Sequence, residues 1–74
     1  MQELTPTVLL VDDDPDILPL LEPPLDRMGL ACHKAATLAD ARLLLARNRY
    51  VLCLTDMRLP DGNGIELVRE IATL

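Results

Sequence analysis

Residues 51–64 read VLCLTDMRLPDGNG, a short apolar run that passes directly into a polar loop. Val51 to Thr55 show no alternation of polar and apolar residues, which predicts a strand buried on both faces. Asp56 follows at the carboxyl end of that strand, where open α/β sheets bind their ligands. A carboxylate there can act as a nucleophile, and aspartyl phosphate is one known product. The alternative is that Asp56 only ends the strand or caps a turn.

Composition limits the possible functions of this 74-residue chain, which is shorter than a typical domain of about 100–150 residues. Its net charge of −5, from 7 basic and 12 acidic residues, disfavours direct contact with nucleic acid. Cys32 and Cys53 lie in apolar runs and are expected to be reduced, buried thiols. The sequence shows no signal peptide and no apolar run of about 20 residues, so we expect a cytoplasmic protein without a membrane segment.

A second acidic segment lies near the start of the chain. The apolar run at residues 8–11, VLLV, predicts a buried strand, and Asp12, Asp13 and Asp14 follow it at once. Adjacent carboxylates repel one another unless a cation or a basic group is close. Asp14 before Pro15 fits an N-cap and a first helical residue. Capping does not explain Asp12 and Asp13.

The first predicted helix covers residues 15–28 and ends at Gly29. Prolines at positions 19, 23 and 24 interrupt its pattern. Each interior proline removes a backbone donor and costs about 3 kcal/mol or more. We therefore expect Pro23 and Pro24 to break or kink the second half of this helix.

The remaining elements alternate between strand and helix. Residues 30–34 predict a weak edge strand on which His33 faces solvent. A helix begins at Thr37, with Asp40 three residues later in an arrangement like a capping box. A last helix begins near Gly64 after Asn63 as N-cap. Its expected inward face consists of Ile65, Val68, Ile71 and Ala72.

Strands that alternate with helices in this way predict a parallel sheet. If the first and third strands are central neighbours, their carboxyl ends bring Asp12, Asp13 and Asp56 to one edge of the sheet. Three clustered carboxylates need a cation, and oxygen ligands favour Mg²⁺ or Mn²⁺. Because Mg²⁺ combines one or two carboxylates with phosphate oxygens, the pattern points to phosphoryl transfer.

Two motifs resemble the receiver domain of bacterial two-component response regulators. They are VLLVDDDPDI at residues 8–17 and LTDMRLPDGNG at residues 54–64. The resemblance implies an α/β, flavodoxin-like fold, here truncated, with a parallel sheet of order 2-1-3 and three helices. The segment DMRLPDG at residues 56–62 is most similar to regulators of the nitrogen-regulation and type IV pilus group. Those regulators carry an ATPase domain acting on sigma-54 polymerase and a helix-turn-helix domain.

The resemblance also implies roles for individual residues. Asp56 would accept a phosphoryl group from a sensor histidine kinase. Mg²⁺ would be held by Asp12, Asp13, Asp56 and the backbone carbonyl of Arg58, with Asp13 as a direct ligand and Asp12 acting through water. The chain would then be a signalling receiver in transcription regulation, not an enzyme.

Residues 1–74 would form a partial receiver domain, because only the first three of five strand–helix units have counterparts in the sequence. The family's switch Thr or Ser, its phosphoryl-contacting Lys and its aromatic switch residue belong to the missing units. The third strand would then have an open edge, so we expect self-association or partial disorder of the isolated chain.

Two other functions remain open. One is a Mg²⁺-dependent phosphohydrolase of the aspartyl-phosphate type, in which a second acid would stand two residues after the nucleophile. Arg58 occupies that position and disfavours this hypothesis. The other is a degenerate or truncated receiver fragment that acts only as an interaction module without phosphorylation. Absence of Mg²⁺ binding would favour the interaction module.

Overall fold

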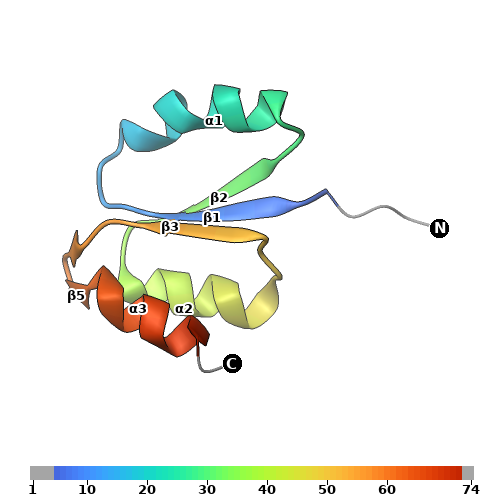
Figure 1. The fold of residues 1–74 in the computed structure, drawn as a ribbon. Helices are drawn as coiled ribbons and strands as arrows, with labels where there is room; N and C mark the ends of the chain where they lie inside the picture. Colours follow the sequence, from blue (N-terminus) through green and yellow to red (C-terminus); the bar gives the residue numbers. More distant parts are fainter. Residues whose placement is uncertain (1–4, 73–74) are drawn as a thin grey trace.

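A parallel three-stranded sheet lies at the centre of the computed structural model, which describes residues 5–72 (Figure 1). The strands are β1 (Thr7–Val11), β2 (Ala31–Ala35) and β3 (Leu52–Thr55), in the order β2-β1-β3. In the register, Val8 of β1 lies between Cys32 of β2 and Leu52 of β3. This topology confirms the predicted α/β fold and places β2 at an edge.

Helices cover both faces of the sheet. Helix α1 (Ile17–Arg27) lies on one face, and α2 (Leu38–Arg47) and α3 (Gly64–Ala72) lie together on the other (Figure 1). None of the helices in the described part of the chain is long and apolar enough to cross a membrane.

The main core lies between the sheet and the α2–α3 layer, and we call this side of the sheet the closed face. Alternate residues of a strand point to the same side, so Leu9 and Val11 of β1 meet Leu38 of α2 and Leu67 of α3. All four are fully buried. Leu44, Leu45, Tyr50, Cys53 and Ile71 pack around this cluster.

The side of the sheet under α1 is packed less completely, and we call it the open face. No residue of Ile17–Arg27 is fully buried, because α1 packs mainly against β2. Leu52 and Leu54 of β3 are 48% and 39% exposed. The prediction that this strand is buried on both faces is therefore wrong. Only its closed-face side, which carries Cys53, packs into the core.

Helix α1 also differs from expectation. It begins at Ile17, two residues later than predicted, and continues through Pro23 and Pro24 without a break. Both prolines are exposed, so their rings lie away from the sheet. Gly29 has a φ of 77° and ends the helix as predicted. The N–H groups of Gly29 and Leu30 donate to the carbonyls of Asp26 and Leu25, which is the Schellman pattern.

Helix α3 is rotated from its predicted orientation. Gly64 and Leu67 are buried and Ile71 is half-buried, whereas Ile65 and Val68 are exposed. The predicted inward face, which contained Ile65, Val68, Ile71 and Ala72, is therefore wrong except for Ile71. The spacing of Gly64, Leu67 and Ile71 still follows one helical face, and the close approach of Gly64 to the strand end selects it.

Three smaller predictions involve single side chains. Thr37 caps α2 as predicted, since its side chain accepts from the Asp40 N–H. His33 is exposed as predicted, but its Nδ1 also lies 2.7 Å from the hydroxyl of Tyr50. Cys32 and Cys53 are free thiols that are only half-buried, and this burial raises the pKa of each.

Candidate functional site

Three carboxylates gather where β1 and β3 end. Asp12, Asp13 and Asp56 each place a carboxylate oxygen within 4.8 Å of the others. The register explains this, because Val11 pairs with Thr55 and the next residues are Asp12 and Asp56. The Asp56 N–H donates to the Val11 carbonyl at 2.8 Å, which extends the ladder to the acidic residue. The expected clustering is therefore confirmed, whereas the roles of these residues remain predictions.

The turn after β1 is organised by short-range hydrogen bonds. Asp12 Oδ1 accepts from the Asp14 N–H, and Asp14 Oδ1 accepts from the Asp16 N–H, both at 2.9 Å. Lys34 Nζ donates to the Asp14 carbonyl at 2.8 Å and supplies a basic group beside the acidic run. The N-cap of α1 is Asp16, without a side-chain bond, so the prediction of Asp14 as N-cap is wrong.

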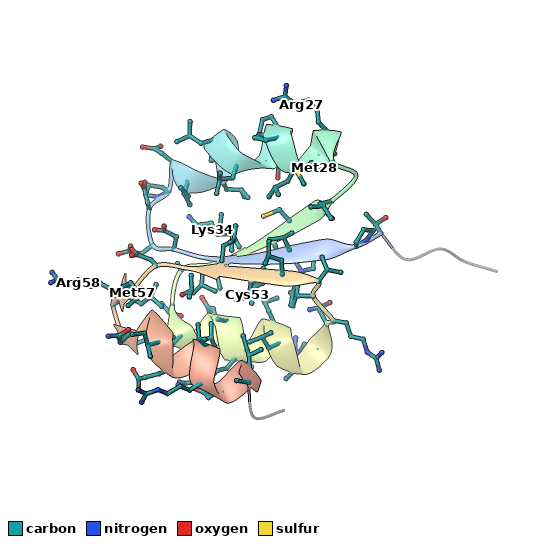
Figure 2. The ribbon with its side chains drawn as sticks, in the orientation of Figure 1. Arg27, Met28, Lys34, Cys53, Met57 and Arg58 are labelled. Atoms are coloured by element: carbon teal, nitrogen blue, oxygen red, sulfur yellow. The ribbon has the colours of Figure 1, made fainter. Side chains whose placement is uncertain are left out.

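The loop after β3 forms a small hairpin that the sequence did not reveal. Strands β4 (Arg58–Leu59) and β5 (Gly62–Asn63) pair antiparallel, with Pro60 and Asp61 at the turn. The Arg58 N–H lies 3.5 Å from Asp56 Oδ1, and the Arg58 side chain extends away from the fold at this edge (Figure 2). The backbone carbonyl of Arg58 remains a predicted metal ligand.

Gly64 fixes the distance between α3 and the strand end. A Cβ atom at this position would collide with the Asp56 carbonyl oxygen and would lie 2.7 Å from Thr55 Oγ1. The Thr55 hydroxyl donates to the same carbonyl, and the Gly64 N–H donates to the Met57 carbonyl at 3.0 Å. Only glycine allows this approach, so Gly64 helps to hold the backbone of Asp56.

A reciprocal cap holds the far end of the loop. Asn63 Oδ1 accepts from the Ile65 N–H at 2.9 Å, which confirms Asn63 as N-cap. Glu66 Oε2 accepts from the Asn63 N–H at 3.0 Å. Asn63 and Glu66 thus form a capping box. The sequence signal for the bond from Asn63 N–H to Glu66 is the spacing of three residues between them.

Asp61 is the residue that sequence reasoning missed most clearly. Its carboxylate accepts from the Leu38 N–H at 2.8 Å and from the Ala39 N–H at 3.0 Å. These two bonds hold the pKa of Asp61 below its ordinary value. The sequence signals only a turn at Pro60-Asp61-Gly62, and nothing in local spacing connects that turn to α2.

The donor set at the strand ends fits a hard divalent cation. All of its side-chain ligand atoms are carboxylate oxygens, which Mg²⁺ and Mn²⁺ prefer to soft ligands. A hollow of about 180 Å³ adjoins the cluster and is lined by Asp12, Thr55, Asp56 and apolar residues of β1, α1 and β3. The hollow leaves room beside the carboxylates for a small bound group.

Two regulatory proteins of Pseudomonas aeruginosa are similar in sequence to most of this chain. PilR, a response regulator protein of Pseudomonas aeruginosa, is 57% identical over 63 residues, which cover 85% of this chain and 14% of PilR. DctD, the C4-dicarboxylate transport transcriptional regulatory protein of the same organism, is 40% identical over 67 residues, which cover 86% of this chain and 14% of DctD. The chain thus spans about a seventh of the length of these two relatives.

Solved structures lead to the same family. The non-phosphorylated HemR receiver domain of Leptospira biflexa superposes with a TM-score of 0.81 at 35% identity, covering 92% of this chain and 55% of that one. The MaeR response regulator bound to beryllium trifluoride gives a TM-score of 0.82 at 34% identity, covering 92% of this chain and 57% of that one. Residues 8–74 match the family described as the response regulator receiver domain. With its strand order and its acidic cluster, this chain belongs to that family.

Proposed function

We propose that this chain is the phosphoacceptor receiver of a two-component system and that Asp56 takes the phosphoryl group. The observation that carries the proposal is the convergence of Asp12, Asp13 and Asp56 within 4.8 Å at the ends of β1 and β3. Asp56 is half-buried and has its backbone fixed by Val11 and Gly64. A nucleophile needs this kind of fixed position.

The proposed transfer is a substitution at phosphorus. A carboxylate oxygen of Asp56 attacks the phosphorus of a phosphohistidine on a sensor kinase. A P–O bond forms, the P–N bond breaks, and the imidazole leaves with the electron pair of that bond and takes a proton from solvent. Water later attacks the same phosphorus and releases phosphate, which restores the Asp56 carboxylate.

The acidic residues give this site its proposed cofactor. Asp12, Asp13, Asp56 and the Arg58 carbonyl would hold Mg²⁺. When bound, Mg²⁺ would neutralise the negative charge that develops on the phosphoryl oxygens. The carboxylates of Asp12 and Asp13 would otherwise repel an incoming phosphoryl group.

The family supports the wider proposal. Response regulator receiver domains are phosphorylated by sensor histidine kinases, and PilR and DctD are named as regulatory proteins. We propose that this chain receives its phosphoryl group in the cytoplasm and controls transcription through a regulator of the sigma-54 group. It would be phosphorylated stoichiometrically and would not be a turnover enzyme, because each chain would hold one phosphoryl group on Asp56 until water removes it.

The test is phosphorylation by acetyl phosphate with MgCl₂, followed by intact mass. The wild-type chain should gain one phosphoryl group, and Asp56→Asn should gain none. Asp14→Asn is a matched control, since Asp14 lies in the same acidic run but outside the cluster. It should be phosphorylated like the wild type. A folded wild-type chain that gains nothing would overturn the proposal.

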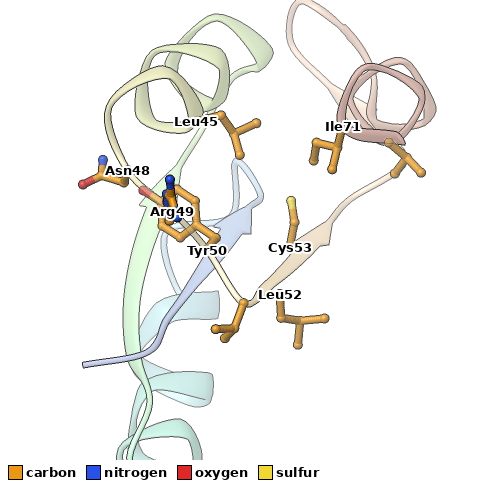
Figure 3. Close-up of a pocket in the computed structure, with 9 residues that line it drawn as sticks. Leu45, Asn48, Arg49, Tyr50, Leu52, Cys53 and Ile71 are labelled. Atoms are coloured by element: carbon orange, nitrogen blue, oxygen red, sulfur yellow. The ribbon is translucent and has the colours of Figure 1, made fainter. Parts of the chain in front are cut away.

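A second candidate, the interaction module, is favoured by the open edge of β3. Among residues 5–72, β3 pairs with β1 alone, and Val51, Leu52 and Leu54 are substantially exposed. Beside this edge lies a groove of about 630 Å³ between the end of α2 and α3, in which Leu45 and Ile71 face Cys53 (Figure 3). Unpaired apolar edges template pairing with another strand.

We propose a second copy of this chain as the partner for that edge. A two-fold axis would run the two β3 strands antiparallel, so that the open edge of each copy pairs with that of the other. Light scattering after size-exclusion chromatography should show a dimer that dissociates on dilution. A monomer at all concentrations would contradict this proposal without affecting phosphorylation by acetyl phosphate.

A further inference from the structure

Asp61 links the loop beside the acidic cluster to a distant helix. It lies at the turn of the β4–β5 hairpin, yet its carboxylate bonds to α2. Oδ1 accepts from the Leu38 N–H at 2.8 Å, and Oδ2 accepts from the Ala39 N–H at 3.0 Å. Both oxygens of one exposed side chain are therefore committed to another element.

The backbone donors at the start of α2 show how specific this contact is. The first N–H groups of a helix have no partner within it. Thr37 supplies one local acceptor, since its Oγ1 takes the Asp40 N–H at 3.1 Å. The N–H groups of Leu38 and Ala39 instead bond to Asp61. Helix α2 is thus capped twice, once by its own N-cap and once by the hairpin.

Packing reinforces the same junction. Leu38 is fully buried, and Leu59 of β4 belongs to the same core cluster. Gly62, next to Asp61, lies so close to α2 that a Cβ atom there would come within 2.6 Å of Leu38 Cδ1. The hairpin is therefore pressed against the first turn of α2 at the point where Asp61 bonds to it.

The other side of the hairpin faces the acidic cluster. Arg58 starts β4, pairs with Asn63 of β5 and has its N–H 3.5 Å from Asp56 Oδ1. We propose that Asp61 is a positioning residue. It holds the Arg58 peptide group beside the acidic cluster and so raises the affinity of the cluster for Mg²⁺. The Mg²⁺ part rests on the proposed function, whereas the hold on the hairpin does not.

Three variants separate positioning from helix capping. Asp61→Ala removes both acceptors, and Asp61→Asn keeps one oxygen but turns an NH₂ group toward a backbone N–H. Thr37→Ala is the matched control, because it removes a cap bond at the same end of α2 without touching the hairpin. Loss of a cap, in Asp61→Ala or in Thr37→Ala, should speed amide exchange in the first turn of α2 by about fivefold.

The experiment measures backbone amides by NMR in the 74-residue chain. Amide exchange is recorded without metal, and MgCl₂ is then titrated while the shifts of residues 12, 13 and 56–58 are followed. Asp61→Ala should raise the Kd for Mg²⁺ by about tenfold, the low end of the range for a group that orients a metal ligand. It should also speed exchange of the amides of residues 58, 59 and 61–63. Thr37→Ala should leave both nearly unchanged, although it speeds exchange in α2.

Each outcome decides between the two roles. Equal Mg²⁺ affinity and equal hairpin exchange in Asp61→Ala and Thr37→Ala would show that Asp61 is only a helix cap, and the inference would be overturned. If the wild type binds no Mg²⁺, the proposed function fails, and the exchange rates of the hairpin still decide the role of Asp61. If Asp61→Ala does not fold, Asp61→Asn decides by the same two measurements.

Discussion

The closed and open faces of the sheet differ in how completely they are packed. On the closed face, Leu9, Leu38 and Leu67 are at most 1% exposed. On the open face, Leu52 and Leu54 are 48% and 39% exposed, and α1 adds no fully buried residue. Most of the hydrophobic stabilisation should therefore come from one side of the sheet, because that stabilisation scales with the apolar area removed from water.

The two halves of the acidic site are supported by these different faces. The loop after Asp56 is anchored on the closed face by Leu59, by Gly64 and by the bonds of Asp61 to α2. The turn that carries Asp12 and Asp13 leads to α1 on the open face. It is held by bonds within itself and by two bonds with β2, from the Asp12 N–H to the Ala35 carbonyl and from Lys34 Nζ to the Asp14 carbonyl, but it contributes no residue to the buried core cluster. The half that carries Asp56 should therefore be the more rigid part of the site.

Removing a closed-face side chain should have the largest effect on stability. Leu67→Ala would leave a cavity in the core and should lower the free energy of unfolding by about 2–5 kcal/mol. Urea denaturation followed by circular dichroism would measure this loss. Leu20→Ala is the control on α1, where the side chain is 69% exposed. Similar losses in the two variants would show that the faces do not differ as described.

The next largest effect should follow from Gly64→Ala. Alanine is favoured over glycine in helices by about 1 kcal/mol, but here its Cβ would collide with the Asp56 carbonyl. We expect a net loss of about 1–3 kcal/mol, together with weaker phosphorylation by acetyl phosphate. Gly29→Ala is the control, since it strains a φ of 77° but meets no atom within 4 Å. It should lower stability and leave phosphorylation unchanged.

The fold and the acidic cluster could be predicted from the sequence because both depend on short, strong patterns. Two apolar runs that each end in aspartate predict strand ends at one edge, and strand order then brings Asp12 to Asp56. The caps of α2 and α3 were equally visible, because Thr37 and Asn63 stand directly before helical patterns, whereas the cap predicted for α1 was wrong.

The remaining features depend on contacts that no local pattern encodes. The exposure of Leu54 depends on which elements lie over β3, and the rotation of α3 depends on the approach of Gly64 to Asp56. Asp61 accepts bonds from Leu38 and Ala39, which lie 23 and 22 positions before it in the chain. Such contacts follow from tertiary packing, which can override local propensity.

Acid should reduce the stability that the bonds between Asp61 and α2 contribute. Bonds from Leu38 and Ala39 hold the pKa of Asp61 below its ordinary value. Because the pKa of Asp61 is lower in the folded chain than its unfolded value of about 3.9, the ionised carboxylate stabilises the folded state at pH values above that value. This stabilisation is lost as the pH falls through the folded pKa. The Tm advantage of wild type over Asp61→Asn should therefore shrink on acidification below about pH 4. Parallel Tm curves at all pH values would contradict the assigned bonds.

The smallest effect on stability should come from the open face. Leu54→Thr replaces a side chain that is 39% exposed, so the free energy of unfolding should change by less than about 1 kcal/mol. Formation of the proposed dimer should nevertheless weaken, because Leu54 lies on β3, whose outer edge has no partner strand among residues 5–72. Leu43→Gln is the control on α2, where the side chain is 57% exposed and the helix packs against β2 and β1. Light scattering over a range of concentrations separates the two cases. If only Leu54→Thr weakens association, the dimer forms through the β3 edge. If both variants weaken association equally, it depends on general surface hydrophobicity and not on that edge.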